Sequence, residues 1–175
     1  MYIRPDHAEK DLQRLHQFVR DNPFGILTTA IRSENPEHNF IQSSHFPWLL
    51  DTDGSETQEH PGILRGHFAR NNPQAKVLME AQARAYEAKK SQGQDVQPHE
   101  VEVEEEVLVL FNGPFHHYVT SKFYTDTKPK TGEVVPTWNY TAVQAYGKAR
   151  IFCDHDSEAT NSYLQTQIED LPNFC

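Results

Sequence analysis

Residues 133–147 read "EVVPTWNYTAVQAYG", a stretch that places a proline, a tryptophan, an asparagine and two tyrosines around the start of an expected β-strand. A planar heteroaromatic ligand needs such a mixture, because flat apolar surfaces cover its ring and a few placed donors fix its orientation. Core aromatics in a strand, or a subunit interface, would give the same pattern. We keep all three interpretations. The segment consists of Pro136, Thr137, Trp138, Asn139 and Tyr140.

The composition predicts a single domain over residues 1–175 that folds without disulfide bonds or a structural metal. A chain of 175 residues can bury roughly 70% of its unfolded surface. Its two cysteines, Cys153 and Cys175, lack metal-ligand spacing, so we expect reduced thiols and no metal site. No apolar run approaches the ~20 residues of a membrane span, and the N-terminus lacks the apolar core of a signal peptide. We therefore expect a cytoplasmic protein without membrane contact.

Negative charge is concentrated in one segment. The formal net charge is -9, and residues 95–106, "DVQPHEVEVEEE", hold six acidic and no basic residues, which leaves -3 (-9 minus -6) for the rest. Direct nucleic-acid contact needs clustered Lys and Arg, so this charge argues against it. We interpret residues 91–106 as an acidic, flexible insertion, with the alternative that "VEVEEE" extends the following strand.

Hydrophobic spacing and turn residues predict one helix, three strands, a helix, three strands and a closing helix. Apolar residues recur at helical spacing in residues 12–19, and Asp6 with Glu9 resembles a capping box for this helix. The second helix is expected to start at Asn72, a good N-cap, with Pro73 as its first residue. We expect strands at residues 24–31, 39–50, 62–68, 107–113, 116–121 and 142–152, the fifth as hairpin partner of the fourth, and a closing helix at 155–171.

The direct passage from a strand into a helix at residues 62–73 predicts an anion site. Free backbone N–H groups and the positive end of the helix dipole meet at such a point. His67 and Arg70 can add charge-assisted hydrogen bonds to a phosphate, beside Asn71 and Asn72. A capped helix with a solvated arginine is the alternative that these residues leave open.

A second polar cluster, "SSHFPWLL", occupies residues 43–50. Pro47 marks an edge or a bulge in the expected strand, because proline cannot donate to a sheet ladder. The hydroxyl group of Ser44 and the imidazole of His45 can then face a ligand. His45 can equally be an interior histidine with its hydrogen bonds satisfied.

Hydrolytic and zinc chemistry lack support in the sequence. It contains no Gly-rich phosphate loop, no HExxH sequence and no nucleophile elbow. His116 and His117 are adjacent, so their side chains point to opposite faces of a strand and do not chelate one metal readily. No general acid or base can be named from these patterns.

Three motifs in fixed order resemble the PaiB family of FMN-binding split-barrel proteins. They are "GHFARNNP" (66–73), "LVLFNGP" with "HHYVTSKFY" behind it (108–124), and "VVPTWNYTAVQAYG" (134–147). The N-terminal "MYIRPDHAEKD" and "SSHFPWLLD" extend the likeness over about residues 1–152. The longer acidic insertion suggests a eukaryotic, fungal member, and the chain ends at Cys175, before the Trp-Lys-Leu-Ser-Gln-like segment that usually closes the family.

The resemblance implies an α+β fold, a six-stranded antiparallel split β-barrel with flanking helices, which forms a homodimer with FMN at the subunit interface. Residues 135–140, "VPTWNY", would then serve both as interface and as flavin wall. The segment from His67 to Asn72 would meet the FMN phosphate, and Ser44 and His45 align with the family's Thr/Ser-His-x-Pro strand at the flavin edge.

The resemblance leaves several functions open. A flavin-dependent oxidoreductase or a flavin-responsive protein is the first, because a bound flavin supplies redox chemistry. A negative transcriptional regulator of the PaiB type is the second. Related split barrels also bind haem, for which His45, His67 or His116 would be the axial ligand.

Overall fold

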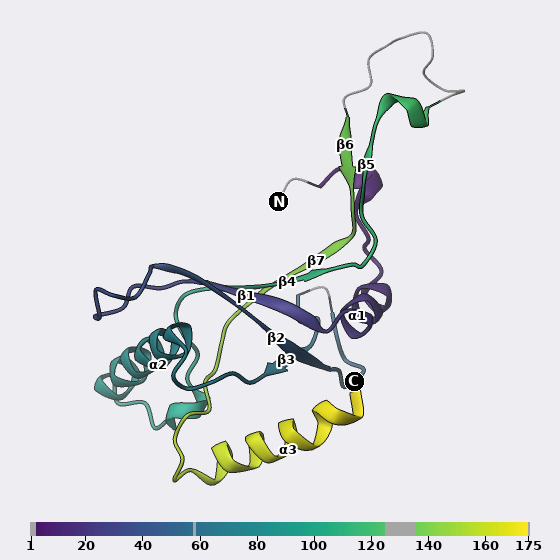
Figure 1. The fold of residues 1–175 in the computed structure, drawn as a ribbon. Helices are drawn as coiled ribbons and strands as arrows, with labels where there is room; N and C mark the ends of the chain where they lie inside the picture. Colours follow the sequence, from purple (N-terminus) through teal and green to yellow (C-terminus); the bar gives the residue numbers. More distant parts are fainter. Residues whose placement is uncertain (1–2, 58, 125–135, 175) are drawn as a thin grey trace.

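The structure is a computed structural model that describes residues 3–57, 59–124 and 136–174 (Figure 1). Its helices are α1 (Leu12–Asp21), α2 (Pro73–Ser91) and α3 (Glu158–Phe174), with short 3₁₀ turns at Pro5–His7, Pro98–Glu100 and Ser121–Phe123. Its strands are β1 (Phe24–Ala30), β2 (Ile41–Asp51), β3 (Ile63–Gly66), β4 (Val107–Asn112), β5 (His117–Val119), β6 (Thr137–Asn139) and β7 (Ala142–Gly147). No helix in these described ranges is long and apolar enough to cross a membrane.

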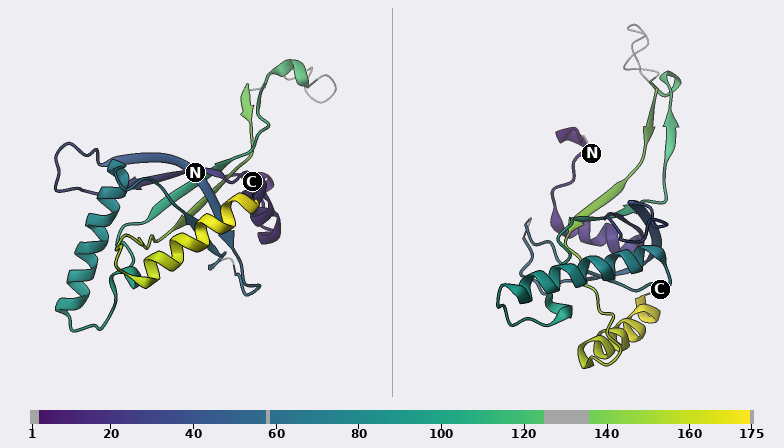
Figure 2. Two further views of the ribbon diagram at one scale, coloured as in Figure 1. Left: turned by 60° about the horizontal axis from the view of Figure 1, so that its bottom comes forward. Right: turned by 90° about the vertical axis from the view of Figure 1, so that its left-hand side faces the viewer.

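A curled antiparallel sheet of five strands, in the order β3-β2-β1-β4-β7, forms a half-barrel. The strands β5 and β6 pair only with each other and project from one end of the sheet as an arm (Figures 1 and 2). The α+β class is therefore confirmed. The expected count of six strands is wrong, because the described chain forms a sheet of five strands and a separate pair.

The expected hairpin between residues 107–113 and 116–121 is also wrong. β4 pairs with β7 instead, from Val107 opposite Gly147 to Asn112 opposite Ala142. The N–H group of Gly113 donates to the carbonyl of Thr141 at 2.9 Å. The chain therefore leaves the sheet after Asn112 and re-enters it at Ala142, directly beside the point where it left. β5 and β6 extend from this point as the arm. Residues 137–139, "TWN", form strand β6, which the sequence pattern did not predict.

The concave face of the sheet holds the core. Alternate residues of two central strands are buried on this face: Gly25, Leu27 and Thr29 on β1, and Val107, Val109 and Phe111 on β4. Helix α2 covers them with Val77, Leu78 and Ala81. The buried amide Nε2 of Gln74, in the first turn of α2, lies 3.1–3.2 Å from acceptors on Leu27, Thr29 and Gln42. This amide ties the start of α2 to the strands beneath it.

The helix starts follow local capping chemistry, with one correction. Asn72 accepts a hydrogen bond from the N–H group of Gln74 at 2.9 Å and Pro73 follows it, which confirms the expected start of α2. The capping box predicted at Asp6 is wrong, because Asp6 lies in a 3₁₀ turn and Asp11 caps α1. The Asp11 carboxylate accepts from Gln13 N at 2.9 Å.

The acidic segment after α2 contains no strand between residues 101 and 106, as the loop interpretation expects. Its valines nevertheless belong to the interior. Val101 and Val103 are fully buried, and the N–H group of Val103 donates to the Ala149 carbonyl at 2.8 Å. Glu102 and Glu104, which alternate with these valines, are exposed, so one side of this part of the segment packs on the core.

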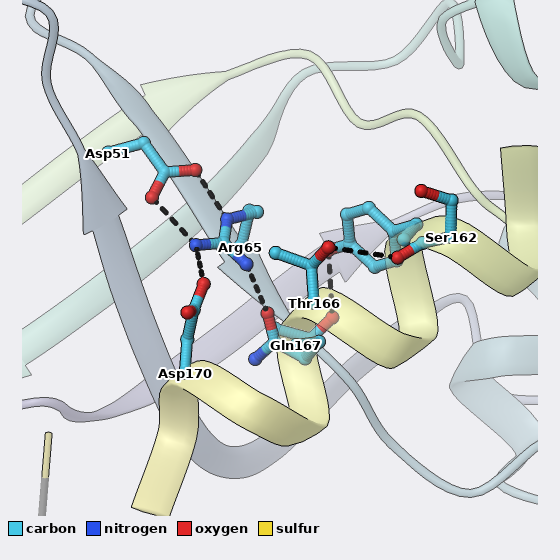
Figure 3. A network of polar contacts seen from close by, with 8 residues as sticks. Asp51, Arg65, Ser162, Thr166, Gln167 and Asp170 are labelled. Atoms are coloured by element: carbon cyan, nitrogen blue, oxygen red, sulfur yellow. Dashed lines mark hydrogen bonds and ion pairs between the residues drawn. The ribbon is translucent and has the colours of Figure 1, made fainter. Parts of the chain in front are cut away.

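A charged network fastens α3 to the edge strand β3 (Figure 3). Arg65 on β3 donates to the Asp51 carboxylate on β2 through Nε and Nη2, and to Asp170 Oδ2 on α3 at 2.8 Å. Its Nη1 donates to Gln167 Oε1 at 3.2 Å. The hydrogen bonds to Asp51 and then Asp170 raise the pKa of Arg65 above its ordinary value, although desolvation opposes them, so the guanidinium stays charged.

Replacing Arg65 with Met should therefore loosen α3. The variant leaves two carboxylates without their shared cation, and we expect the free energy of unfolding to fall by about 2 kcal/mol, since both carboxylates are partly exposed. Arg14→Met is the control, because Arg14 is 75% exposed and should contribute less than about 0.5 kcal/mol. Chemical denaturation measures both variants. Equal losses would show that the network does not hold α3.

Candidate functional site

The two faces of the curled sheet differ in what covers them. Helix α2 packs on the core side of the sheet, whereas α3 contacts the edge strand β3 through Arg65, which alternates with the core-facing Leu64 and Gly66 (Figures 1 and 2). On the side away from the core, β3 and the end of β2 carry Arg65 and Asp51, and Arg65 binds Asp170 of α3. Along β1, β4, β7 and residues 41–47 of β2, the alternate residues that point away from the core are half-buried or exposed, and none of them is Asp, Glu, Lys or Arg. This open sheet face consists of Phe24, Ile26, Thr28, Ile41, Ser43, His45, Leu108, Leu110, Gln144 and Tyr146. An uncharged, partly apolar face of this kind is suited to contact with another surface.

The predicted pair Ser44 and His45 is divided between the two faces. Ser44 lies opposite Leu27 on the core side, and its hydroxyl accepts a hydrogen bond from Asn72 Nδ2 at 3.1 Å. His45 is exposed on the open sheet face and stacks on Phe24 with 5.8 Å between ring centroids. The interpretation of His45 as an interior histidine is thus wrong. Only His45 of the pair can meet a ligand on the open sheet face.

The strand-to-helix turn at residues 67–72 is exposed, apart from Phe68 and Asn72, which are half-buried. Arg70 does not face the start of α2: its Nη1 donates to the Cys153 carbonyl at 2.7 Å and lies 2.7 Å from His155 Nε2. The N–H group of Gln74 already donates to the Asn72 side chain, and Pro73 has no N–H group. The turn is accessible to an anion, but Arg70 has to leave these protein partners to bind one.

The arm carries the aromatic part of the predicted site. Residues 136–140 are all exposed, which rules out the interpretation of "PTWNY" as a core strand. Trp138 and Tyr140 are each 51% exposed. The ring of His116 stacks on Trp138 at 5.4 Å between centroids, and Tyr118, which pairs directly opposite Trp138, has its ring centroid 6.2 Å away. The arm therefore presents aromatic surface to the outside.

A hollow of about 520 Å³ lies where the arm joins the sheet. Rings from Trp138, Tyr140 and His116 line it together with the side chains of Asn112 and Thr141. This arm-base hollow offers flat apolar walls with amide and hydroxyl groups that both donate and accept hydrogen bonds. Asn112 and Thr141 were not predicted, because they become neighbours only when the arm returns to the sheet. Gly113 and Pro114 complete the lining.

These residues fit the flat ring system of a flavin, but one chain does not assemble the whole predicted site. The arm-base hollow lies at the root of the arm, whereas the turn at residues 67–72 lies between β3 and the start of α2 (Figure 1). None of residues 67–72 lines the hollow. Within the described residues, no cluster of three or more His, Cys, Asp or Glu is arranged to hold a metal ion.

Comparisons with known proteins identify relatives over nearly the whole chain. A family model described as "Putative FMN-binding domain" matches residues 1–173. An uncharacterized protein of Emericella nidulans is 57% identical over 172 residues, and one of Aspergillus fumigatus is 54% identical over 176 residues. Each match covers 98% of this chain and 64% of the fungal relative. The chain thus spans less than two thirds of these curated relatives.

A bacterial relative is more distant. The "Protease synthase and sporulation protein PAI 2" of Bacillus subtilis is 32% identical over 149 residues, which is 85% of this chain and 52% of that protein. The fungal and bacterial matches agree with the likeness stated from the sequence motifs.

Gly113 should be required for the geometry of the arm base. A Cβ atom at this position would collide with Thr141 Oγ1 and lie 3.3 Å from the Phe18 ring. We expect Gly113→Ala to lower the free energy of unfolding by about 1–3 kcal/mol, as overpacking does. Gly147→Ala is the matched control at the far end of β7, because nothing lies within 4 Å of its added Cβ. Thermal unfolding compares the two, and a harmless Gly113→Ala would contradict the close packing.

Proposed function

The chain belongs to the FMN-binding domain family that it matches over residues 1–173, and on this basis we propose that it works as a homodimer that holds FMN between its subunits. FMN is the cofactor of this family. The observation that carries the proposal is the arm-base hollow, which joins aromatic walls to hydrogen-bonding side chains at the edge of an uncovered sheet face.

The lining of the hollow suits an isoalloxazine ring. Trp138 and Tyr140 provide flat surface that can cover such a ring and exclude water from it. Asn112 and Thr141 can orient its polar edge, because an amide and a hydroxyl group each donate and accept hydrogen bonds. His116, stacked on Trp138, supports the aromatic wall.

A second subunit explains how the separated parts of the site can meet. The arm extends beyond the body of its own chain (Figure 2), and its described aromatics Tyr118, Trp138 and Tyr140 are each 51% exposed. A partner could receive this arm and bring its own segment from His67 to Asn72 towards the FMN phosphate. The uncharged open sheet face, including Phe24 at 63% and Tyr146 at 56% exposure, offers further surface for the same contact.

We further propose a flavin-dependent oxidoreductase or flavin-responsive protein. Bound FMN supplies hydride and electron transfer, while the residues of the hollow bind, orient and shield the ring. No described side chain is assigned here as general acid or base. The regulator alternative, which rests on the resemblance of the sequence motifs, would act through the flavin or a protein partner, since a net charge of -9 disfavours direct DNA contact.

Haem binding is the second candidate, and one observation favours it. His116 lines the arm-base hollow, where an imidazole could serve as an axial ligand. The absorption spectrum of the purified protein distinguishes the two cofactors, because haem gives a Soret band and flavin gives its own pair of visible and near-ultraviolet bands.

Titration with FMN tests the proposed function. We expect quenching of flavin fluorescence with a dissociation constant in the micromolar range or tighter, which corresponds to about 8 kcal/mol or more. Trp138→Ala should weaken binding by about 2 kcal/mol and shift the protein towards monomer in sedimentation. Ile168→Ala is the control, because Ile168 on α3 is 60% exposed and lies outside both the arm and the hollow.

Each part of the proposal can fail separately. A folded chain that does not quench FMN would contradict flavin binding. A monomer at micromolar concentration that still binds FMN would contradict the two-subunit site, and "VVPTWNY" would then need an explanation within one chain. A Soret band with no flavin binding would favour the haem candidate.

Arg70 is proposed to hold the FMN phosphate, and riboflavin provides the matched ligand without one. Arg70→Ala should weaken FMN binding by about 1.5–3 kcal/mol and leave riboflavin binding nearly unchanged. Arg14→Ala, at a well-exposed position, controls for the loss of a positive charge. Equal losses for both ligands would instead assign Arg70 a structural role, through its contacts with Cys153 and His155.

A further inference from the structure

A second, smaller hollow lies at the N-terminus of α3 and has no described role. Its volume is about 250 Å³, enough for about eight water molecules at ~30 Å³ each. It is lined by residues of α2, of the loop around residue 98, and of residues 151–160. It shares no lining residue with the arm-base hollow. We call it the α3 hollow.

One wall of the α3 hollow is rich in hydrogen-bond donors. Thr160, in the first turn of α3, is 1% exposed, and its Oγ1 has no hydrogen-bond partner among the described residues. A buried hydroxyl without a partner is costly, so native proteins usually satisfy it with a ligand or an ordered water. The first-turn N–H groups, which have no partner within the helix, and the positive end of its dipole lie beside the Ser157 hydroxyl, while Glu158 of the same turn is exposed and does not line the hollow. This wall favours a carboxylate.

The α3 hollow is also lined by hydrogen-bond acceptors, one of them a carboxylate. The Asp154 carboxylate is exposed, and only its Oδ1 has a described partner, the N–H group of Asp156 at 3.1 Å. Gln82 is 4% exposed, and its Nε2 donates to the Val101 carbonyl at 2.9 Å, which leaves its Oε1 as an acceptor. Both side chains line the hollow. They favour a ligand group that donates hydrogen bonds and carries positive charge.

A simple anion satisfies only the first wall and is repelled by Asp154, whereas a simple cation is opposed by the helix dipole. A small molecule that carries both charges satisfies both walls. We propose that the α3 hollow binds a zwitterion of the α-amino acid type. Its carboxylate meets the first turn of α3 and the Thr160 hydroxyl, and its ammonium group meets Asp154 and Gln82. Its side chain lies towards the remaining lining residues, which include Ile151 and Pro98.

Calorimetric titration of the full chain tests this inference with defined probes. The standard amino acids are screened at millimolar concentration, with propionate and propylamine as matched probes that carry one charge each. We expect at least one amino acid to bind while neither single-charge probe binds at the same concentration. The binding should persist with and without FMN, because the two hollows are separate. Failure of FMN binding would therefore leave this result unaffected.

Two substitutions locate the site. Thr160→Val keeps the shape of the side chain and should weaken amino acid binding at least tenfold, and Asp154→Asn should do the same. Thr166→Val is the control on the same helix, because Thr166 is exposed and its Oγ1 donates to the Ser162 carbonyl at 3.0 Å. The unfolding midpoint of ligand-free Thr160→Val should not fall, since the hydroxyl has no described protein partner to lose.

Several results would overturn the proposal. They are a screen in which no amino acid binds, propionate or propylamine binding as well as the amino acid, and unchanged binding by Thr160→Val. A lower unfolding midpoint for ligand-free Thr160→Val would also overturn it, because the hydroxyl would then have a structural role. A hollow that holds water only corresponds to the first of these results.

Discussion

One-sided burial of the curled sheet is the constraint on which the rest of this structure depends. An antiparallel sheet can pack one face against a core and leave the other open. Here α2 covers the concave face, and the Gln74 amide fixes its start beneath β1 and β2. On the other face, the open sheet face formed by β1, β4, β7 and the first part of β2 consists of uncharged residues, and α3 contacts only the β3 edge, through Arg65, within the described residues. A surface of that composition, continuous with the root of an aromatic arm, is consistent with a site completed by a second subunit.

The third helix is attached by different forces. An amphipathic helix normally buries an apolar stripe, but the fully buried residues described on α3 are polar, Thr160 and Gln167. Instead, Arg65 attaches α3 to the sheet. It forms ion pairs with Asp51 on β2 and Asp170 on α3, and it donates a hydrogen bond to Gln167 Oε1. These contacts lie in the C-terminal half of α3. The α3 hollow lies at the opposite end of the helix, beside its first turn.

The flavin site illustrates how family membership and geometry contribute different information. Membership assigns FMN as the cofactor but does not assign residues. The geometry brings Trp138, Tyr140 and His116 around one hollow and keeps residues 67–72 away from it. It also turns Ser44 towards Asn72 and His45 outwards, because successive residues of a strand point to opposite faces. Residues 67–72 thus lie outside the hollow, which is consistent with the proposed two-subunit site.

The sequence by itself determined the local elements of this protein and its family. Capping at Asn72, the alternation in β1 and the apolar run of β4 are properties of a few neighbouring residues, so the pattern alone predicts them. The motifs around residues 66–73, 108–124 and 134–147 were also sufficient for the family. Tertiary structure alone decided that β4 pairs with β7, that β5 and β6 pair as an arm, and that Asn112, Thr141 and Thr160 line hollows. Strand partners and cavity walls are set by residues far apart in the chain, whose meeting depends on the free energy of the whole fold rather than on any local preference.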